Sequence, residues 1–246
     1  MKLEIIGFNV ESCISAQEAG ANRIELCDNP EEGGTTPSYG FIQAARKRLS
    51  IELYVMIRPR GGDFLYSDEE LEIMKADIET CKQLGCDGIV TGILNKDGSI
   101  DKKRTAALVG YAYPLGATFH RAFDRVTNYS VALEDVIETG CERILTSGLS
   151  PKAMVGISII KELIMQANDR IIIMPASGVN AENIIQIAES TGATEFHSSA
   201  SILKESKMDY QNAAMDEKMN HIVANGNQIK NMSALLKNFE SSLSQP

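Results

Sequence analysis

The chain has 246 residues, 43% of them hydrophobic, which is enough to bury a sizeable core in one barrel or in two small domains. Its 24 basic and 33 acidic residues give a net charge of −9, which opposes non-specific attraction to nucleic acid and to anionic membranes. We find no signal-peptide pattern and no run of roughly 18 apolar residues that would suit a membrane helix. We therefore expect no nucleic-acid or membrane partner.

The five cysteines indicate the compartment in which the protein works. They form no CxxC pair and their number is odd, which fits a reducing compartment better than a framework of disulfides. We expect a cytoplasmic protein in which most of these cysteines are small buried hydrophobic residues.

A short motif occurs four times along the chain. In each copy a helical pattern ends in Gly, and an apolar residue four positions later opens a strand. The copies are GANRI (20–24), GCDGI (85–89), GCERI (140–144) and GATEF (192–196). Gly is expected at the end of each helix because it adopts the left-handed conformation without steric cost. The copies lie 65, 55 and 52 residues apart, each about the length of two strand-helix units.

Four further apolar runs are typical of strands. They begin near the N-terminus (LEIIGF) and at Glu52, Ala117 and Arg170, which brings the predicted number of strands to eight. Strict alternation of short strands with helices predicts a parallel sheet, and eight such units predict a single TIM-type (β/α)8 barrel over residues 1–246. An open, doubly wound sheet is the structural alternative.

Amphipathic helices are expected between the strands. Residues 67–85 open with Ser67 and Glu70 in the spacing of a capping box, and residues 180–192 have Asn180 as the predicted N-cap. The chain after Leu203 contains a polar stretch and then apolar residues at helical spacing, which predicts a closing helix at about 226–243.

The motif copies also predict which side chains point into the barrel. Alignment of the copies places Glu25, Val90, Leu145 and His197 at one position, and Cys27, Gly92, Ser147 and Ser199 two residues further on. Successive side chains of a strand point to opposite faces, and the intervening residues, such as Ile24, are more apolar. Since the more apolar face should pack against the helices, we expect Glu25 and His197 to face inward and to lie close enough to meet.

Polar residues gather where the predicted strands end. The segment GATFHRAFD (116–124) brings His120 and Asp124 to the C-terminal end of its strand, where barrels of this kind place their sites. Arg58 and Arg60 follow the third strand, and arginine binds phosphate or carboxylate with paired hydrogen bonds. Later loops are rich in Ser and Gly and are predicted to bind an anion, with Ser147, Ser177, Gly178, Ser198 and Ser199 as the candidate contacts.

The same residues also have structural explanations. Ser and Gly make tight turns, Arg58 could form a fixed ion pair with Glu25 or Asp28, and either histidine could be a hydrogen-bonded structural residue. A scaffold without a small ligand is disfavoured, because it gives no reason to hold costly polar groups around one mouth.

Several segments of the sequence resemble one known family. The segments IELCDNPEEGGTTPS, MIRPRGGDFLYSDEE, GCDGIVTGIL, TFHRAFD, RILTSG, ASGVN and EFHSSA occur in the order and at the separations of the CutC family, named for copper homeostasis. The resemblance runs from about residue 2 to residue 203. It implies a single TIM-type barrel, a cytosolic homo-oligomer (a dimer or tetramer) and a role in binding or handling Cu(I).

The resemblance also implies a copper ligand. Other members of the family carry two cysteines proposed as a copper pair; this chain keeps Cys27 on the second strand, and Ile6 stands at the position of the other. Cu(I) prefers thiolate, thioether and imidazole ligands, which makes Cys27 the predicted metal ligand. Met56, His120 and His197 are the other inward candidates.

The residues themselves favour an alternative function, an enzyme or binding barrel for a small molecule that carries phosphate or carboxylate. His120 or His197 would transfer a proton in acid-base chemistry. Glu25 or Asp124 would orient that histidine or act as its catalytic partner, and the two arginines after the third strand would hold the anion.

Overall fold

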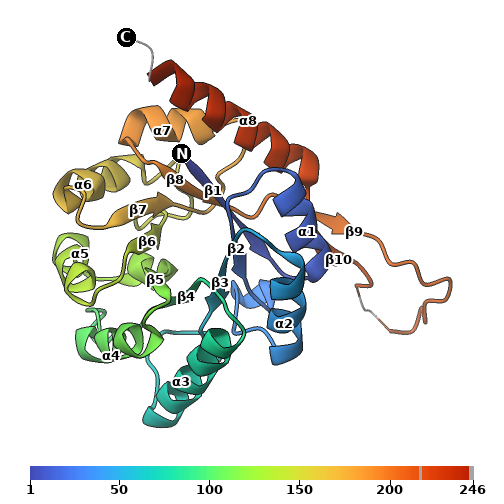
Figure 1. Ribbon diagram of the computed structural model, residues 1–246, viewed down its shortest axis with the longest axis horizontal. Coiled ribbons are helices and arrows are strands. Elements are labelled where there is room, and N and C mark those ends of the chain that lie inside the picture. The colour runs from blue at the N-terminus through green and yellow to red at the C-terminus, as the bar shows by residue number, and fades with distance from the viewer. Residues whose placement is uncertain (216–217, 244–246) are drawn as a thin grey trace.

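The chain forms a ring of parallel strands with the helices outside it (Figure 1). The computed structural model describes residues 1–215 and 218–243. The strands of the ring are β1 (Lys2–Gly7), β2 (Arg23–Leu26), β3 (Glu52–Met56), β4 (Gly88–Thr91), β5 (Gly116–Phe119), β6 (Arg143–Thr146), β7 (Ile172–Pro175) and β8 (Glu195–Ser198). They form one sheet in the order β7-β6-β5-β4-β3-β2-β1-β8, and its end strands lie beside each other, which nearly closes the barrel. The predicted TIM-type barrel is confirmed.

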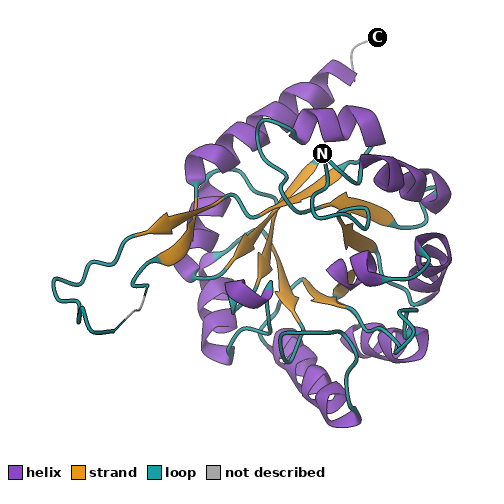
Figure 2. Cartoon of the chain, turned by 180° about the vertical axis from the view of Figure 1, so that it is seen from behind, coloured by secondary structure: helices purple, strands orange, loops and turns teal. Residues whose placement is uncertain are grey.

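The helices surround the strands, as Figure 2 shows from behind. They are α1 (Val10–Glu18), α2 (Tyr39–Arg48), α3 (Asp68–Gln83), α4 (Lys102–Ala112), α5 (Tyr129–Glu138), α6 (Ile157–Ala167), α7 (Ile184–Thr191) and α8 (Gly226–Leu243), with the short 3-10 turns η1 (Pro30–Glu32) and η2 (Arg121–Arg125). The last helix, α8, lies where the apolar spacing predicts one. None of the described helices is both long and apolar enough to cross a membrane.

Local signals in the sequence explain where most of these helices begin and end. Ser67 and Glu70 form the predicted capping box at the start of α3. The glycine of each motif copy has a positive φ, as the predicted helix ends require. The predicted N-cap at Asn180 is wrong, because a turn in which the Asn180 N–H donates to Asn183 Oδ1 precedes the helix, and α7 begins only at Ile184.

The predicted register of the strands is confirmed. Ile24, Leu26, Ile57 and Phe119 belong to the large hydrophobic core. Cys27 packs instead with Tyr54, Met56 and Val90 in a separate cluster, and Leu145 packs with Met174 and Ala176 in another. Because neighbouring residues of a strand point to opposite faces, these smaller clusters belong to the barrel interior.

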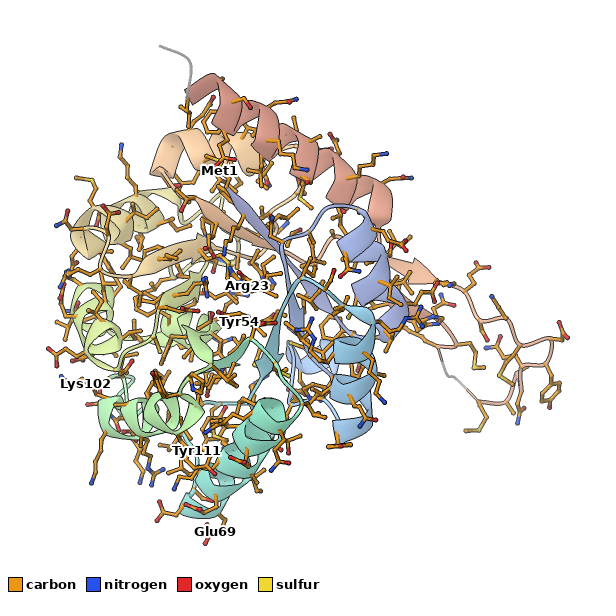
Figure 3. All side chains as sticks on the ribbon, in the orientation of Figure 1. Met1, Arg23, Tyr54, Glu69, Lys102 and Tyr111 are labelled. Carbon is orange, nitrogen blue, oxygen red and sulfur yellow. The ribbon has the colours of Figure 1, made fainter. Side chains whose placement is uncertain are left out.

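Charged side chains fill the interior at the N-terminal ends of the strands. Oε2 of Glu195 accepts hydrogen bonds from both terminal nitrogens of Arg23, at 2.8 and 2.6 Å, and from Nε of Arg143 at 2.7 Å. The ring of Tyr54 lies 4.9 Å from the Arg23 guanidinium and 5.4 Å from that of Arg143. Figure 3 shows Arg23 and Tyr54 at the centre of the ring of strands. Arg23, Arg143 and Glu195, paired with one another and packed against Tyr54, thus form a layer in the barrel interior below the C-terminal mouth.

The segment before α8 contains a hairpin that the sequence analysis did not predict. Its strands β9 (Ser201–Lys204) and β10 (His221–Ala224) pair antiparallel, and the described residues between them project sideways from the barrel (Figure 1). The base of the hairpin is fixed to α1 and to the residue before it. Asn9 Nδ2 donates to the carbonyl of Ile222 at 2.8 Å, and the Ala224 N–H donates to Ser12 Oγ at 3.0 Å.

Candidate functional site

A large cavity lies at the C-terminal ends of the strands. Its volume is about 550 Å³, and its walls come from the strand ends, the loops that follow them and the base of the β9–β10 hairpin. Seven of the predicted catalytic and anion-binding residues line it: Glu25, Arg58, His120, Ser177, Gly178, His197 and Ser199. The structure therefore brings these residues together around one space, while their functional roles stay predictions.

Two carboxylates flank the His197 ring on the inner wall. Its Nδ1 lies 2.7 Å from Glu4 Oε1, and its Nε2 lies 3.8 Å from Glu25 Oε2. The strand register produces this arrangement, because Glu4 is opposite His197 across β1 and β8, and Ile6 is opposite Glu25 across β1 and β2. All three charged residues are buried. The predicted proximity of Glu25 and His197 is confirmed.

Burial and neighbouring charges set the protonation of these three groups. Burial raises the pKa of Glu25 to about 7; the charge of Glu4 adds to the rise, and His197 offsets part of it. Burial lowers the pKa of His197, but Glu25 and Glu4 outweigh it and leave this pKa raised. Burial raises the pKa of Glu4, but its hydrogen bond to His197 and the nearby positive charges bring it below the usual value. An ionised Glu4 then accepts the Nδ1–H, and Nε2 faces Glu25.

Arg58 reaches the same cavity from the end of β3. Its terminal nitrogens donate to three backbone carbonyls, those of Glu32 at 2.7 Å, Gly34 at 2.8 Å and Gly62 at 3.0 Å. The ring of Phe64 lies 4.9 Å from the guanidinium. The ion pair with Glu25 or Asp28 that we considered from the sequence is not formed in the described part of the chain.

His120 stands at the end of β5, beside the same aromatic ring. Its Nδ1 accepts a hydrogen bond from the Ala122 N–H at 3.2 Å, which caps the η2 turn. The ring centroids of His120 and Phe64 are 4.8 Å apart. Gly92 makes room for the imidazole, since a Cβ at that position would lie 2.6 Å from Nδ1. Burial, with a contribution from the Arg58 charge, lowers the pKa of His120 to about 3.

Asp124 and Ser147 do not line the cavity, and they form hydrogen bonds that join the η2 turn to the end of β6. Asp124 accepts hydrogen bonds from Thr146 Oγ1 at 2.6 Å, from the Ser147 N–H at 2.9 Å and from Arg121 Nε at 2.7 Å. The Ser147 hydroxyl also donates to Asp124, at 2.8 Å. The carboxylate is therefore saturated by fixed protein partners, and it supports Arg121, which does line the cavity. The pairing of Asp124 with a site histidine that we considered from the sequence is not among its hydrogen bonds.

Two other predicted contacts point away from the cavity. Arg60 donates from Nε to Glu70 at 2.5 Å, pairs with Asp63 at 3.0 Å and lies against the Tyr66 ring. Because these two carboxylates neutralise it, Arg60 is not positioned to share an anion with Arg58. Ser198 is buried, and its hydroxyl donates to the Val179 carbonyl at 2.6 Å.

Similarity to known proteins supports one family. The sequence profile of the CutC family matches residues 1–202. The chain belongs to the CutC family. It is 48% identical over 213 residues to the copper homeostasis protein cutC homolog of Homo sapiens, with 87% of this chain and 78% of the human protein covered. It is 50% identical over 209 residues to a family protein CutC of Chromobacterium violaceum, with 85% of each covered.

A solved CutC structure has the same fold. The crystal structure of CutC from Streptococcus agalactiae superposes on this chain with a TM-score of 0.78 at 38% identity. The superposition covers 81% of this chain and 98% of that one. The match to the CutC profile ends within β9, so the rest of the β9–β10 hairpin and α8 lie beyond the matched residues.

In this CutC family member, Cys27 is buried beside Met56. A Cβ placed at Gly34 would lie 3.1 Å from Cys27 Sγ and 3.5 Å from Met56 Cε, so the two sulfur-bearing side chains lie next to one another. Burial, together with Glu25, raises the pKa of the Cys27 thiol well above its usual value. Ile6 packs against the same cluster, at the position where the family resemblance implies a second cysteine.

A second group of possible metal ligands also lies in the interior. Among the described residues, Glu4, Glu25 and His197 have donor atoms within 4.8 Å of one another. Arg23 Nε is 3.4 Å from Glu4, and that carboxylate is already bonded to Nδ1 of the histidine. A cation would have to compete with both partners, so this arrangement fits proton transfer better than metal binding.

Two residues that contribute to the site, Glu4 and Phe64, were not predicted from the sequence. Glu4 stands two residues before the inward-facing Ile6, so the same alternation that places Ile6 inside would have found it. Phe64 lies in the loop after β3, where no periodic pattern predicts which way a side chain points. Its ring nonetheless contacts both Arg58 and His120.

Proposed function

We propose that this CutC family member binds a small anionic molecule in the mouth of its barrel and transfers a proton to or from it. The observation that carries the proposal is the line of Glu4, His197 and Glu25 in the barrel interior, in which His197 and Glu25 line the cavity and Glu4 lies behind the histidine. Burying two carboxylates on either side of one imidazole costs free energy, because charged groups lose their solvation. Titratable groups in such strongly perturbed surroundings are typical of functional sites. The basic side chains that line the cavity, Arg58, Arg121 and Arg125, supply the attraction for an anion.

Each residue of the line has a distinct part in this proposal. Glu25 has a pKa raised to about 7 by burial, so it can take up or release a proton near neutral pH. Nε2 of His197 is 3.8 Å away and can exchange a proton with Glu25 or with a ligand group beside it. Glu4 accepts the Nδ1–H and fixes the tautomer. A proton removed from the ligand would stay on Glu25 or His197 until it is returned.

A ligand screen tests the binding half of this proposal. Small molecules released from natively purified protein would be identified by mass spectrometry, and a panel of carboxylic acids and phosphate esters would be tested by thermal melting. We expect an anionic compound to co-purify, or at least one panel member to raise the melting temperature, because a ligand that binds only the native state stabilises it. The proposal would be contradicted by an uncharged co-purifying ligand, or if no anion co-purified and no panel member changed the melting temperature.

Copper handling is the second candidate, and the contact of Cys27 with Met56 favours it. A thiolate and a thioether are ligands that Cu(I) prefers. Cu(I) would be titrated against a competing chelator under reducing conditions, with the wild type and Cys27→Ser side by side. Cys141→Ser, which removes another buried cysteine, is the matched control. We expect Cys27→Ser alone to weaken binding, and equal affinity in all three proteins would remove Cys27 from the proposal.

We also propose that the protein acts as a cytoplasmic homo-oligomer, a dimer or tetramer. The odd number of cysteines and the family resemblance support this. Light scattering during size-exclusion chromatography would measure the mass directly, and a monomer at micromolar concentration would contradict it.

A further inference from the structure

Two residues that line the cavity each have a buried nitrogen donor with no hydrogen-bond partner among the described residues. The donors are Nε of Arg58 and Nε2 of His120. Both side chains line the cavity, with only 5% of Arg58 and 3% of His120 exposed. Buried N–H groups nearly always have an acceptor, so two unpaired donors on residues that line one cavity point to an acceptor on a ligand.

The unpaired positive charge of Arg58 also indicates that the ligand is an anion. Three backbone carbonyls satisfy its terminal nitrogens, yet carbonyls carry no net charge. None of the ion pairs formed within residues 1–215 and 218–243 includes Arg58, whereas Arg60 on the same loop pairs with two carboxylates. A buried guanidinium without a counter-ion is costly, and an anion in the cavity would compensate it.

The hydrogen bond at the other ring nitrogen fixes what His120 can offer. Because Nδ1 accepts the Ala122 N–H, a neutral ring carries its proton on Nε2 and can only donate from there. The Phe64 ring lies against both residues, 4.9 Å from the Arg58 guanidinium and 4.8 Å from the His120 centroid, so the two side chains belong to the same part of the cavity wall. His120 is therefore suited to hold an oxygen atom and not to carry the transferred proton.

We infer that Arg58 and His120 form an oxyanion subsite that holds a carboxylate of the ligand, with Arg58 Nε–H and His120 Nε2–H donating to its oxygens. One positive charge and two donors match a planar, singly charged group with two oxygens. The inference rests on the proposed function and deepens it. The inferred ligand is a carboxylic acid. Arg58 and His120 would bind its carboxylate while Glu25 and His197 transfer a proton to or from another part of the molecule.

Conservative substitutions distinguish the loss of a hydrogen bond from these nitrogens to the ligand from a loss of folding. His120→Asn keeps an acceptor for the Ala122 N–H but loses the Nε2 donor, whereas His120→Gln offers a donor near the Nε2 position. Arg58→Lys keeps the charge and loses the Nε–H. Arg60→Lys is the matched control, because its partners Glu70 and Asp63 lie outside the cavity.

Binding of pyruvate, acetate and inorganic phosphate would be measured by calorimetry or NMR titration. We expect the wild type to bind a carboxylate more tightly than phosphate. His120→Asn and Arg58→Lys should weaken carboxylate binding about tenfold or more, with His120→Gln less affected and Arg60→Lys within about twofold of the wild type. Unchanged carboxylate affinity in both His120→Asn and Arg58→Lys would overturn the subsite, as would tighter binding of phosphate.

A measurement on protein with an intact subsite covers the case in which these variants fail to fold. Nitrogen-15 NMR of the imidazoles, in a His221→Asn background that removes the exposed histidine, should show a neutral Nε2–H ring whose signal shifts when pyruvate is added. A ring that carries its proton on Nδ1 would overturn the subsite. Neither result depends on Glu25. If Glu25→Gln left proton transfer intact while the subsite variants lost affinity, the proposed function would fail and the subsite would stand.

Discussion

Glu4 and His197, 193 residues apart in the sequence, are joined by a 2.7 Å contact between Oε1 and Nδ1 in the barrel interior. The contact exists because β1 and β8 are neighbours in the sheet, with Glu4 directly opposite His197. It leaves Nε2 of the histidine facing Glu25 and the cavity. A residue on β1 thus accepts the Nδ1–H of a residue on β8 and fixes the tautomer of its ring.

Replacing Glu4 should change the titration of His197. In the unsubstituted protein Glu4 helps to raise the pKa of His197. Glu4→Gln removes the carboxylate charge, so this pKa should fall by about one pH unit or more. NMR titration of the imidazole signals measures this. Glu52→Gln is the control, because Glu52 also pairs with Arg23 but is not among the groups that shift His197. An unchanged pKa in Glu4→Gln would mean that this contact does not set the charge of the ring.

His120 should make the protein sensitive to acid. Burial lowers its folded-state pKa to about 3 from 6.5, so below pH 6.5 the unfolded state binds more protons and stability falls as the pH falls. At pH 4.5 this loss is on the order of 2–3 kcal/mol relative to pH 7.5. His120→Asn cannot take up that proton. Urea unfolding of both proteins at the two pH values should therefore show a smaller loss in the variant, and equal losses would contradict a buried neutral ring.

Asp124→Asn should act mainly on stability. The carboxylate accepts hydrogen bonds from three side chains, those of Arg121, Thr146 and Ser147, and from the backbone N–H groups of Ser147 and Leu149. An amide has one acceptor oxygen and cannot accept from all of them. We expect a loss of about 2–3 kcal/mol in the free energy of unfolding, with ligand affinity changed little once the variant is folded. Asp135→Asn, which alters a surface ion pair with Lys102, should cost less. Full stability with lost binding would instead place Asp124 in direct contact with the ligand.

Glu195→Ala should be among the most destabilising single changes. It would leave the buried guanidiniums of Arg23 and Arg143 without their shared carboxylate, and breaking a buried pair in this way costs about 3–5 kcal/mol. Glu134→Ala removes an exposed ion pair with Arg170 and is the control for a surface contact. Chemical denaturation would compare them. Similar small losses in both variants would show that the interior layer does not depend on Glu195.

Much of the fold and part of the site could be predicted from the sequence, for a physical reason. The two-residue period of a strand and the glycines that end the helices are local features, and this pattern alone is enough to place Glu25, Cys27 and His197 inside the barrel. Side chains beyond the strand ends follow no such period. Arg60 looks equivalent to Arg58 in the sequence, yet it turns outward because Glu70 and Asp63 lie there to pair with it.

Hydrogen bonding also separates residues that look alike in the sequence. His120 and Asp124 are both polar residues at the end of one strand. In the structure, Nε2 of His120 is buried without a hydrogen-bond partner, whereas Asp124 is surrounded by donors. These differences arise from contacts between loops that are distant in the sequence. Neither composition nor residue spacing predicts such contacts. The β9–β10 hairpin was missed because each of its strands has only four residues, too few for a clear periodic pattern, and three of the four residues of β9 are exposed.

The central claim is that Glu25 and His197 move a proton on a bound anion, and hydrogen-deuterium exchange tests it most directly. A carboxylic acid shown to bind would be incubated with protein in D2O, and NMR would follow the loss of its carbon-bound protons. Glu31→Gln, a change to an exposed carboxylate at the rim of the same cavity, is the control. The account predicts exchange in the wild type and in Glu31→Gln, and a loss of about 100-fold or more in Glu25→Gln with binding retained. Exchange that is undiminished in Glu25→Gln, or absent from the wild type with the ligand bound, would contradict it.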